Sequence, residues 1–335
     1  MIEFLITMNI LITGGAGYIG SVVTSQLVKA GHKLVVFDNL VKGHRKAVHP
    51  EARFVKGDIS DSKLVEKILK ENDIEAVMHF AAFIEAGESM KVPEKYFHNN
   101  TINTLLFLET MLKSGIKKFV FSSTAAVYGD PKKIPITEDA DLKPTNAYGV
   151  SKLLVEQTLF WYHQIHGLKY AALRYFNACG ATDKLGEDHD PETHLIPRAL
   201  DAVMRKDPHL QLFGTDYPTK DGTCIRDYIH VSDLARAHLL ALSALDKHSK
   251  GKMIYNLGSQ NGFSNREVIE AVGKVVGKSV PFENASRRVG DPAILIASSE
   301  KINKELGWKP KYTKIEDIIE TAYKWCLEHP KGYSY

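Results

Sequence analysis

Two side chains four residues apart, Tyr148 and Lys152, carry the chemistry that the sequence offers most clearly. If a helix begins near Asn146, after Pro144, this spacing places the phenol and the ammonium on one helix face. A tyrosine ionises near pH ~10, so its use as a base at neutral pH costs about 4 kcal/mol. One positive charge at ~4 Å, in an effective dielectric constant of about 20, supplies that amount. We therefore expect Lys152 to lower the pKa of Tyr148, although a solvated surface pair has the same spacing.

A glycine-rich turn near the N-terminus indicates what such a base would work with. An apolar run is followed by Gly14, Gly17 and Gly20 and then by a helical pattern. A strand, turn and helix of this kind bind a pyrophosphate through backbone N–H groups and the helix N-terminus. A second apolar strand ends in Asp38, close to the distance of ~20 residues typical of the acid that binds the adenosine ribose. Because a carboxylate repels a 2′-phosphate, the pattern favours NAD over NADP.

Apolar runs and amphipathic stretches alternate through the first half of the chain. The pattern predicts strands at 9–13, 33–37, 52–56, 76–80, 118–122 and 169–174, and helices near 61–71, 93–114 and 146–166. This rhythm is typical of an α/β fold with a doubly wound parallel sheet of the Rossmann type. Ligands of such sheets bind beyond the carboxyl ends of the strands. We therefore expect the chemistry at that edge, with a smaller C-terminal α/β lobe completing the site.

Several separated motifs together resemble one enzyme superfamily. They are the glycine turn, Gly57-Asp58, His-Phe-Ala-Ala at 79–82, Ser-Ser-Thr at 122–124 and the Tyr-x-x-x-Lys pair. This set resembles the extended short-chain dehydrogenase/reductase superfamily. From about residue 8 to the end, the chain is similar to the UDP-glucose 4-epimerase family within it, with further matching stretches at 86–89, 174–177, 213–219, 222–231 and 287–291. The resemblance implies an NAD-binding domain, 8–176 with a returning segment near 225–260, and a nucleotide-sugar-binding domain, 177–224 and 261–335.

The resemblance assigns roles residue by residue. It makes Tyr148 the catalytic base, Lys152 its electrostatic partner and a ribose ligand, and Thr124 the hydroxyl that orients the sugar oxygen. The implied NAD-binding residues, besides Tyr148 and Lys152, are Gly14, Gly17, Tyr18, Ile19, Gly20, Asp38, Asn39, Asp58, Ile59, Phe80, Ala81, Ala82, Asn99, Ser122 and Tyr175. The implied substrate-binding residues, besides Thr124 and Tyr148, are Asn177, His194, Leu195, Phe213, Arg226, Arg288, Asp291 and Leu295. Two alternatives stay open: Phe213 as a core residue, and Arg226 as the ion-pair partner of Asp227.

The implied reaction is the reversible C4 epimerisation of UDP-glucose and UDP-galactose through a 4-keto sugar, with tightly bound NAD. A nucleotide-sugar 4,6-dehydratase is the main rival, but similar dehydratases carry an Asp-Glu pair directly after the threonine. Ala125 and Ala126 occupy those positions and cannot transfer a proton. The same absence weakens a decarboxylase interpretation. A non-catalytic NAD-dependent sensor would not need Thr124, Tyr148 and Lys152.

Two departures from the family's pattern bear on binding. Leu295 stands where some epimerases narrow the sugar pocket with a tyrosine. We therefore expect room for a 2-acetamido group, so that UDP-GlcNAc and UDP-GalNAc are further candidate substrates. Ile84 stands where several epimerases carry a lysine near the cofactor phosphates. A cation from that position is therefore missing.

Composition bounds the remaining possibilities. The chain has 335 residues, 44% of them hydrophobic, which is enough for a large core in two lobes. A net charge of +3 is too small to indicate a nucleic-acid partner. No run approaches the ~20 apolar residues of a membrane span. The three cysteines are widely spaced, as in proteins of a reducing compartment, so we expect a cytoplasmic enzyme with no membrane association.

Three further expectations concern particular segments. The stretch 186–194 is rich in acids and histidines but has no recognised ligand spacing, so we expect no metal there. Residues 1–7 lack the basic region of a signal peptide and read as an extension ahead of Met8. By analogy with similar enzymes, the helices near 93–114 and 146–166 are expected to form a homodimer.

Overall fold

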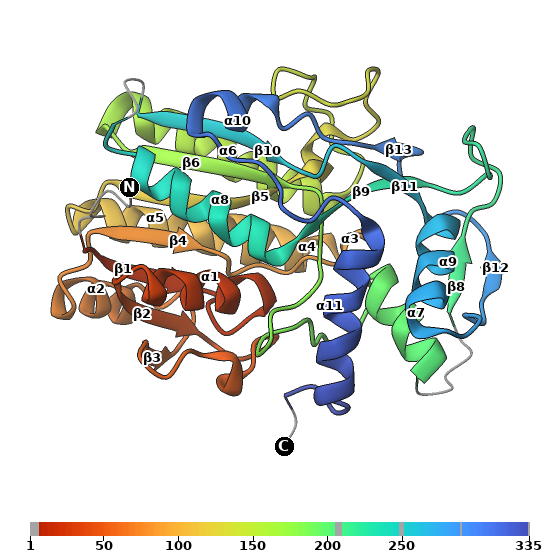
Figure 1. Ribbon diagram of the computed structural model, residues 1–335. Helices are drawn as coiled ribbons and strands as arrows, with labels where there is room; N and C mark the ends of the chain where they lie inside the picture. Colours follow the sequence, from red (N-terminus) through yellow and green to blue (C-terminus); the bar gives the residue numbers. More distant parts are fainter. Residues whose placement is uncertain (1–6, 205–209, 248–250, 289, 334–335) are drawn as a thin grey trace.

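The computed structural model describes residues 7–204, 210–247, 251–288 and 290–333. Nearly all of the extension expected at residues 1–7 lies outside this range. Two lobes lie side by side, with the large sheet on the left of Figure 1 and α7, α9, β8 and β12 on the right. The first lobe contains the large sheet, and the second supplies the opposite wall of the site.

A seven-stranded parallel sheet forms the first lobe, in the order β10-β6-β5-β4-β1-β2-β3. Its strands are β1 (Asn9–Thr13), β2 (Lys33–Asp38), β3 (Arg53–Lys56), β4 (Ala76–His79), β5 (Lys118–Thr124), β6 (Lys169–Tyr175) and β10 (Lys252–Leu257). The order changes direction at β1, with β2 on one side and β4 on the other. Ligands of open α/β sheets bind at such a switch point. The predicted doubly wound parallel sheet is therefore confirmed.

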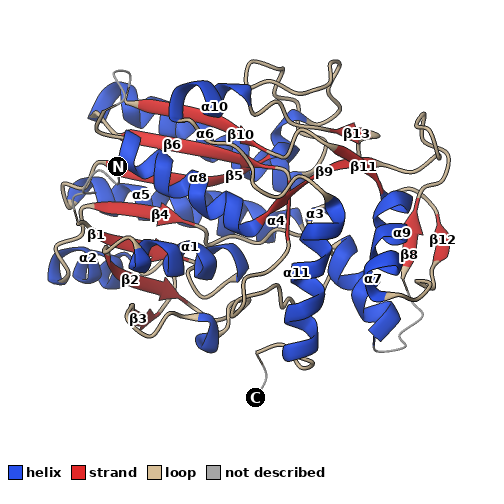
Figure 2. Cartoon of the chain, in the orientation of Figure 1, coloured by secondary structure: helices blue, strands red, loops and turns tan. Residues whose placement is uncertain are grey.

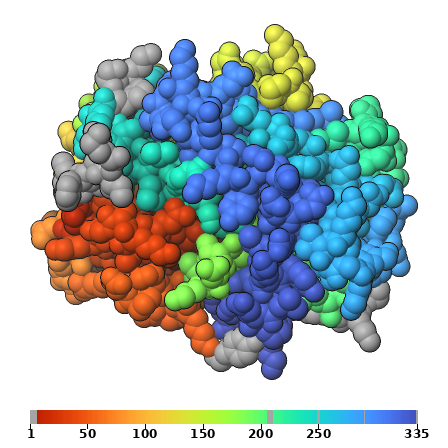
Figure 3. Space-filling view, in the orientation of Figure 1, coloured from red at the N-terminus to blue at the C-terminus, as the bar shows by residue number. Residues whose placement is uncertain are grey.

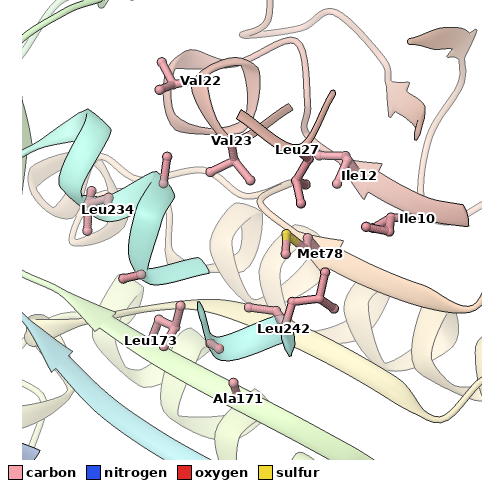
Figure 4. Packing of buried hydrophobic residues seen from close by; sticks show 14 of the residues in the cluster. Ile10, Ile12, Val22, Val23, Leu27, Met78, Ala171, Leu173, Leu234 and Leu242 are labelled. Atoms are coloured by element: carbon pink, nitrogen blue, oxygen red, sulfur yellow. The ribbon is translucent and has the colours of Figure 1, made fainter. Parts of the chain in front are cut away.

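Helices cover both faces of this sheet (Figure 2). They are α1 (Tyr18–Lys29), α2 (Ser62–Glu71), α5 (Asn103–Lys113), α6 (Ala147–His166) and α8 (Val231–Ala244), with the short turns η1 (Arg45–Ala47), α3 (Ala86–Ser89) and η3 (Ala125–Tyr128). Figure 4 shows the core under α1 and α8, where Val23, Leu27 and Leu234 meet Ile12 and Leu173 of the strands. A second core lies under α2, α5 and α6. Because helices bury both faces, the central strands are mostly apolar and position the loops at their ends rigidly.

The helical stretch predicted near 93–114 is confirmed, but it consists of three successive segments. A short helix, α4 (Pro93–Tyr96), is followed by a π-helical turn, η2 (Phe97–Ile102), and then by α5. Within the turn, the Asn100 amide accepts a hydrogen bond from Phe83 N and donates one to Phe83 O, each at 2.9 Å. This pair fastens the turn to the loop after β4. Such π-bulges re-aim side chains and are frequent at functional sites.

The second lobe contains two small sheets and three helices. Its strands are β7 (Asn177–Cys179), β8 (Gln211–Phe213), β9 (Ile225–His230), β11 (Gly262–Ser264), β12 (Glu283–Ala285) and β13 (Ile294–Leu295), and its helices are α7 (Leu195–Met204), α9 (Asn265–Val276) and α11 (Ile315–Glu328). The chain returns through α8 and β10 to the first lobe, on which α10 (Glu300–Leu306) also packs. β9 belongs to the second sheet, although it falls in the returning segment expected near 225–260. The domain boundaries stay a prediction.

No helix among the described residues is both long and apolar enough to cross a membrane.

All three cysteines are free thiols, with Cys179 and Cys224 buried.

Candidate active site

The glycine turn between β1 and α1 brings backbone close to backbone at the carboxyl edge of the sheet. Gly14 has φ +72°, and a Cβ there would lie 2.5 Å from the backbone nitrogen of Ala81. A Cβ on Gly20 would lie 2.3 Å from the carbonyl oxygen of Gly14. Gly17 caps α1 without a side-chain hydrogen bond and faces the cavity. The first N–H groups of α1 therefore point at an open space suited to an anion.

Asp38 lies at the end of β2, as predicted, and its carboxylate is held in place by backbone donors. It accepts hydrogen bonds from Ala16 N at 3.0 Å and Leu40 N at 2.8 Å. Burial raises the pKa of Asp38, and the two backbone hydrogen bonds oppose that change. Beside it, Asn39 donates to Asp58 at 2.8 Å. This corner therefore presents a fixed row of acceptors to a ribose or an adenine.

Tyr148 and Lys152 lie in the first turns of α6, which Asn146 caps by accepting a hydrogen bond from Gly149 N at 2.8 Å. The ammonium of Lys152 donates to the carbonyl of Ser122 at 2.9 Å. Burial lowers the pKa of Lys152 to about 7.

The expected lowering of the tyrosine pKa is not found, because loss of water around the phenol raises the pKa of Tyr148 to about 12. A hydrogen bond with Thr124 opposes that rise, and the charge of Glu85 adds to it. Lys152 is not among the groups that shift the phenol. The ammonium of Lys152 donates its hydrogen bond to the backbone of β5 instead.

Thr124 ends β5, directly opposite the start of α6. Its side chain accepts a hydrogen bond from Ala126 N at 3.1 Å, which begins the turn η3. The same side chain contacts the phenol of Tyr148 through the hydrogen bond named above. The structure therefore brings together the predicted threonine, tyrosine and lysine. Ala125 and Ala126 follow without an acid, as the sequence shows.

Two arginines face the site from the second lobe. Arg226 donates to Asp291 at 2.9 Å, so its ion-pair partner is not Asp227. The carboxylate of Asp227 accepts instead from Ser259, Gln260 and Ala297.

Phe213 supports the second arginine. The guanidinium of Arg288 lies 4.0 Å from the ring centroid of Phe213, a cation–π contact that orients the arginine. Phe213 is half-buried and lines none of the site's pockets, so its part is to position Arg288.

One cavity of about 410 Å³ lies between the two lobes and collects the predicted cofactor residues. Its lining includes Gly14, Gly17, Tyr18, Ile19, Gly20, Asp38, Asn39, Asp58, Ile59, Phe80, Ala81, Ala82, Asn99, Ser122, Tyr148 and Tyr175. Lys152 alone of that set is absent from the lining, because it is buried behind Ser122.

The predicted substrate residues gather at the same place. Asn177, His194 and Arg288 line the large cavity, and two adjoining pockets take in Leu195, Arg226, Asp291 and Leu295. Thr124 and Tyr148 line both the large cavity and the pocket that contains Leu295. The hydroxyl groups therefore stand at the boundary between the two.

Sequence reasoning missed several lining residues. Lys42 lies 3.2 Å from Glu85 at the cavity wall, next to Ile84. A cation is therefore present at this wall, although it comes from the loop after β2. The loop before α7 contributes Glu187 and His189 to the cavity lining. The sequence analysis did not count them as site residues, because the loop matches no known motif. The signal that could have identified them is the concentration of acids and imidazoles in one short loop.

Comparisons with known proteins agree with this geometry. The family model described as the NAD dependent epimerase/dehydratase family matches residues 10–258. A UDP-glucose 4-epimerase of Lacticaseibacillus casei is 52% identical over 328 residues, 97% of this chain and 99% of that protein.

Two solved structures are similar over nearly the whole chain. The UDP-glucose 4-epimerase of Bifidobacterium longum in complex with NAD+ and UDP is 37% identical, with a TM-score of 0.92 over 97% of this chain and 99% of its own. The UDP-Glc/GlcNAc 4-epimerase of Campylobacter jejuni is 43% identical, with a TM-score of 0.83 over 96% and 99%. The chain therefore belongs to the NAD dependent epimerase/dehydratase family and, within it, to the UDP-glucose 4-epimerases.

Proposed function

We propose that the protein interconverts UDP-glucose and UDP-galactose by inverting C4 of the hexose, with NAD as its resident cofactor. The observation that carries this proposal is the position of Thr124 and Tyr148. Their hydroxyl groups lie where the glycine-rich cavity meets the pocket containing Arg226 and Leu295. A sugar carbon at the boundary between the cavity and this pocket would face the cofactor on one side and a proton acceptor on the other.

The residues present fit NAD. The uncapped N-terminus of α1 at Gly17 suits the pyrophosphate, and Asp38 offers its carboxylate to the adenosine ribose. Asn39 and Asp58 line the adenine end, and Lys42 supplies a positive charge at the wall. Bound NAD supplies the acceptor and later the donor of the C4 hydride.

The chain's own residues supply the proton transfer and the binding energy. Tyr148, as the phenolate, would take the proton of the 4-hydroxyl group and become the neutral phenol, which returns that proton when the opposite face of the 4-keto sugar is reduced. Thr124 keeps the sugar oxygen in line with that phenol. Arg226 and Arg288 would bind the diphosphate as charge-assisted forks, with Asn177 beside them. The clamp on the nucleotide leaves the hexose free to turn.

Elimination of water is disfavoured by the same site. A dehydratase must remove the C5 proton and protonate the leaving 6-hydroxyl group. The positions after Thr124 are occupied by Ala125 and Ala126, both of which line the sugar pocket. Neither side chain can exchange a proton, so the 4-keto sugar can only be reduced again.

One experiment tests the proposal directly. The purified protein is incubated with UDP-galactose without added cofactor, and the sugar protons are followed by NMR. The expected product is UDP-glucose, in equilibrium with the substrate. A 4-keto-6-deoxy product would instead establish a dehydratase, and no reaction even with added NAD would favour a sensor.

We also propose that N-acetylated UDP-hexoses are substrates. Leu295 lines the pocket shared with Thr124 and Tyr148, and a leucine leaves more room there than a tyrosine. The similarity to the Campylobacter jejuni UDP-Glc/GlcNAc 4-epimerase supports this proposal. We expect Leu295→Tyr to lose turnover of UDP-GalNAc while retaining that of UDP-galactose. If wild-type protein turns over UDP-galactose well and leaves UDP-GalNAc unchanged, the proposal is wrong.

A cytoplasmic homodimer is the proposed state of the enzyme. Exposed large hydrophobic residues gather on η2, α5 and α6, namely Ile102, Leu106, Leu154, Phe160, Trp161 and Ile165. An apolar surface of this kind marks an interface. Sedimentation should therefore give twice the chain mass for wild type, and Trp161→Glu should shift the protein toward the monomer.

A further inference from the structure

A cluster of two glutamates and two histidines lies outside the catalytic residues, in the loop between β7 and α7. Each of Glu187, His189, Glu192 and His194 offers one ligand atom, and these atoms all lie within 4.8 Å of one another. Within the described parts of the chain, no other group of three or more His, Cys, Asp or Glu residues meets this criterion. The fold of the loop therefore brings four possible metal ligands close together in space, although their spacing in the sequence matches no known motif.

Three of the four distances between these histidine nitrogens and glutamate oxygens are close to those around a small cation, and the fourth is shorter. The Nδ1 atom of His194 lies 2.6 Å and that of His189 3.2 Å from Glu187 Oε1. Glu192 Oε1 lies 3.3 Å from His194 Nδ1, and Glu192 Oε2 lies 3.6 Å from His189 Nδ1. Around zinc, bonds of about 2.0–2.1 Å in a tetrahedron separate the ligand atoms by roughly 3.3–3.4 Å.

Three polar atoms of the cluster lack hydrogen bonds, which is the second observation. Glu187 Oε1, His189 Nδ1 and His194 Nδ1 are buried and have no hydrogen-bond partner, and the side chain of Glu187 is only 7% exposed. The histidine nitrogens lie at ion-pair distance from the glutamates, but not in hydrogen-bond geometry. Leaving such groups unsatisfied is costly, whereas one shared cation would satisfy all of them.

Glu192 is already oriented for such a role. Its Oε1 accepts hydrogen bonds from the backbone of Thr193 at 2.7 Å and His194 at 2.8 Å. These bonds fix the carboxylate and leave Oε2 open toward His189. Ligands held in this way by their surroundings are typical of metal sites.

We propose that Glu187, His189, Glu192 and His194 form a Zn²⁺ site, with one oxygen from each glutamate and Nδ1 from each histidine. Two carboxylates balance the charge of the ion, and two imidazoles suit its intermediate softness. Four protein ligands leave no open position, so the role of the ion is structural. The expectation of no metal in this loop rested on the absence of a known motif, and folding supplies what spacing did not.

A metal ion in this loop would hold the loop in place between the cofactor cavity and the adjoining pocket that contains Leu195. The ring of His189 meets the edge of Tyr18, next to the glycine turn, at a centroid distance of 6.3 Å. His194 directly precedes α7, whose first residue, Leu195, lines the nucleotide pocket. In Figure 3, the green segment that contains this loop lies between the orange N-terminal part and the blue C-terminal part. The ion would therefore stabilise the loop at the place where it lies between the two lobes.

The test measures metal binding rather than activity, so its outcome is independent of the proposed function. Wild-type protein without a histidine tag is dialysed against a chelator and titrated with Zn²⁺ and with Co²⁺. We expect one equivalent of each to bind, with the intense visible absorption of four-coordinate Co²⁺ and a higher thermal unfolding midpoint. His189→Gln and Glu187→Gln should weaken binding by at least ~100-fold, because each removes a ligand rather than a group behind one.

Asp190→Asn is the matched control, since Asp190 is an exposed acid of the same loop outside the cluster. It should bind one equivalent with wild-type affinity. Circular dichroism establishes that each variant is folded. The proposal is overturned if chelator-treated wild type takes up no stoichiometric metal, or if His189→Gln binds as tightly as wild type.

Discussion

The phenol of Tyr148 experiences opposing influences that define its task. Burial raises its pKa to about 12, and the hydrogen bond with Thr124 lowers it. Lys152, with a pKa lowered to about 7 by burial, donates a hydrogen bond to the Ser122 carbonyl and does not shift the pKa of the phenol. A positive charge placed beside the phenol by a ligand would change this balance. The residue is therefore a base whose readiness depends on what fills the cavity.

Removal of the phenolic oxygen tests this role. We expect Tyr148→Phe to lower kcat by roughly 10²- to 10⁴-fold, the usual contribution of a positioned acid–base group. Because the ring remains, NAD content and the Kd for UDP should stay close to wild type. Thr124→Ser is the control, since it keeps the hydroxyl group and should keep most of the rate. An unimpaired Tyr148→Phe enzyme would remove the tyrosine from the mechanism.

At the scale of elements, the strand–turn–helix unit separates two roles of glycine. A Cβ on Gly20 would lie 2.3 Å from Gly14 O, whereas one on Gly17 would meet only that oxygen, at 3.4 Å. We therefore expect Gly20→Ala to destabilise the fold by about 1–3 kcal/mol. Gly17→Ala should leave the NAD-free protein as stable as wild type but weaken NAD by about tenfold or more, roughly 1.4 kcal/mol. Thermal unfolding with and without NAD separates the two effects, and equal behaviour of the variants would contradict the assignment.

The catalytic helix is anchored from behind by a buried ion pair. Arg174 of β6 donates to both carboxylate oxygens of Glu156 in α6, at 3.0 and 2.6 Å, and both side chains are almost fully buried. Ser123 donates to the same carboxylate. Glu156→Gln leaves the guanidinium without its partner charge, so we expect a loss of about 3–5 kcal/mol in the free energy of unfolding.

A surface pair gives the comparison. Glu71→Gln removes the exposed i,i+4 contact with Lys67, which should cost no more than about 0.5 kcal/mol. Urea denaturation of both variants at fixed NAD concentration measures the difference. Equal losses would mean that the buried pair does not hold α6.

The elements that the sequence predicts well are those whose information is local. Continuous apolar runs identify the strands, and the cap at Asn146 starts α6 where the sequence placed it. The π-helical turn at 97–102 was not predictable, because it depends on the amide of Asn100 reaching Phe83, 17 residues away. Likewise, nothing local joins Arg226 to Asp291. The residue types and the sheet edge at which they lie were therefore predictable, whereas the hydrogen-bond and ion-pair partners of these residues were not.

Across the described part of the molecule, three of the buried histidines join elements and are held neutral. His79 lies in the sheet between Thr13 and Thr104, His238 packs on Phe80 and Tyr175, and His230 stacks on Tyr312 at the junction of the lobes. Burial lowers the pKa of His79 to about 3 and those of His230 and His238 to about 4. All three contribute packing that requires an uncharged ring.

Acid should therefore weaken the whole structure in a defined window. Above the unfolded-state pKa of ~6.5, these histidines are neutral in both states and add no pH dependence. Below it, the unfolded chain takes up protons that the folded chain does not, until the folded pKa values are reached. Each histidine then lowers the free energy of unfolding by about 1.4 kcal/mol per pH unit, or roughly 4 kcal/mol per unit for the three between pH ~6 and ~4.

Urea midpoints at pH 7.5 to 5.0, with NAD at a fixed excess, measure this dependence. His79→Gln should reduce the slope below pH 6 by about 1.4 kcal/mol per unit, whatever its effect at pH 7.5, because one titrating ring is gone. His166→Gln, at an exposed position of α6, should leave the slope unchanged. Carboxylates that titrate in the same range affect all three proteins equally, so the difference isolates the histidine. An identical slope for His79→Gln and wild type would show that the ring is charged in the folded protein.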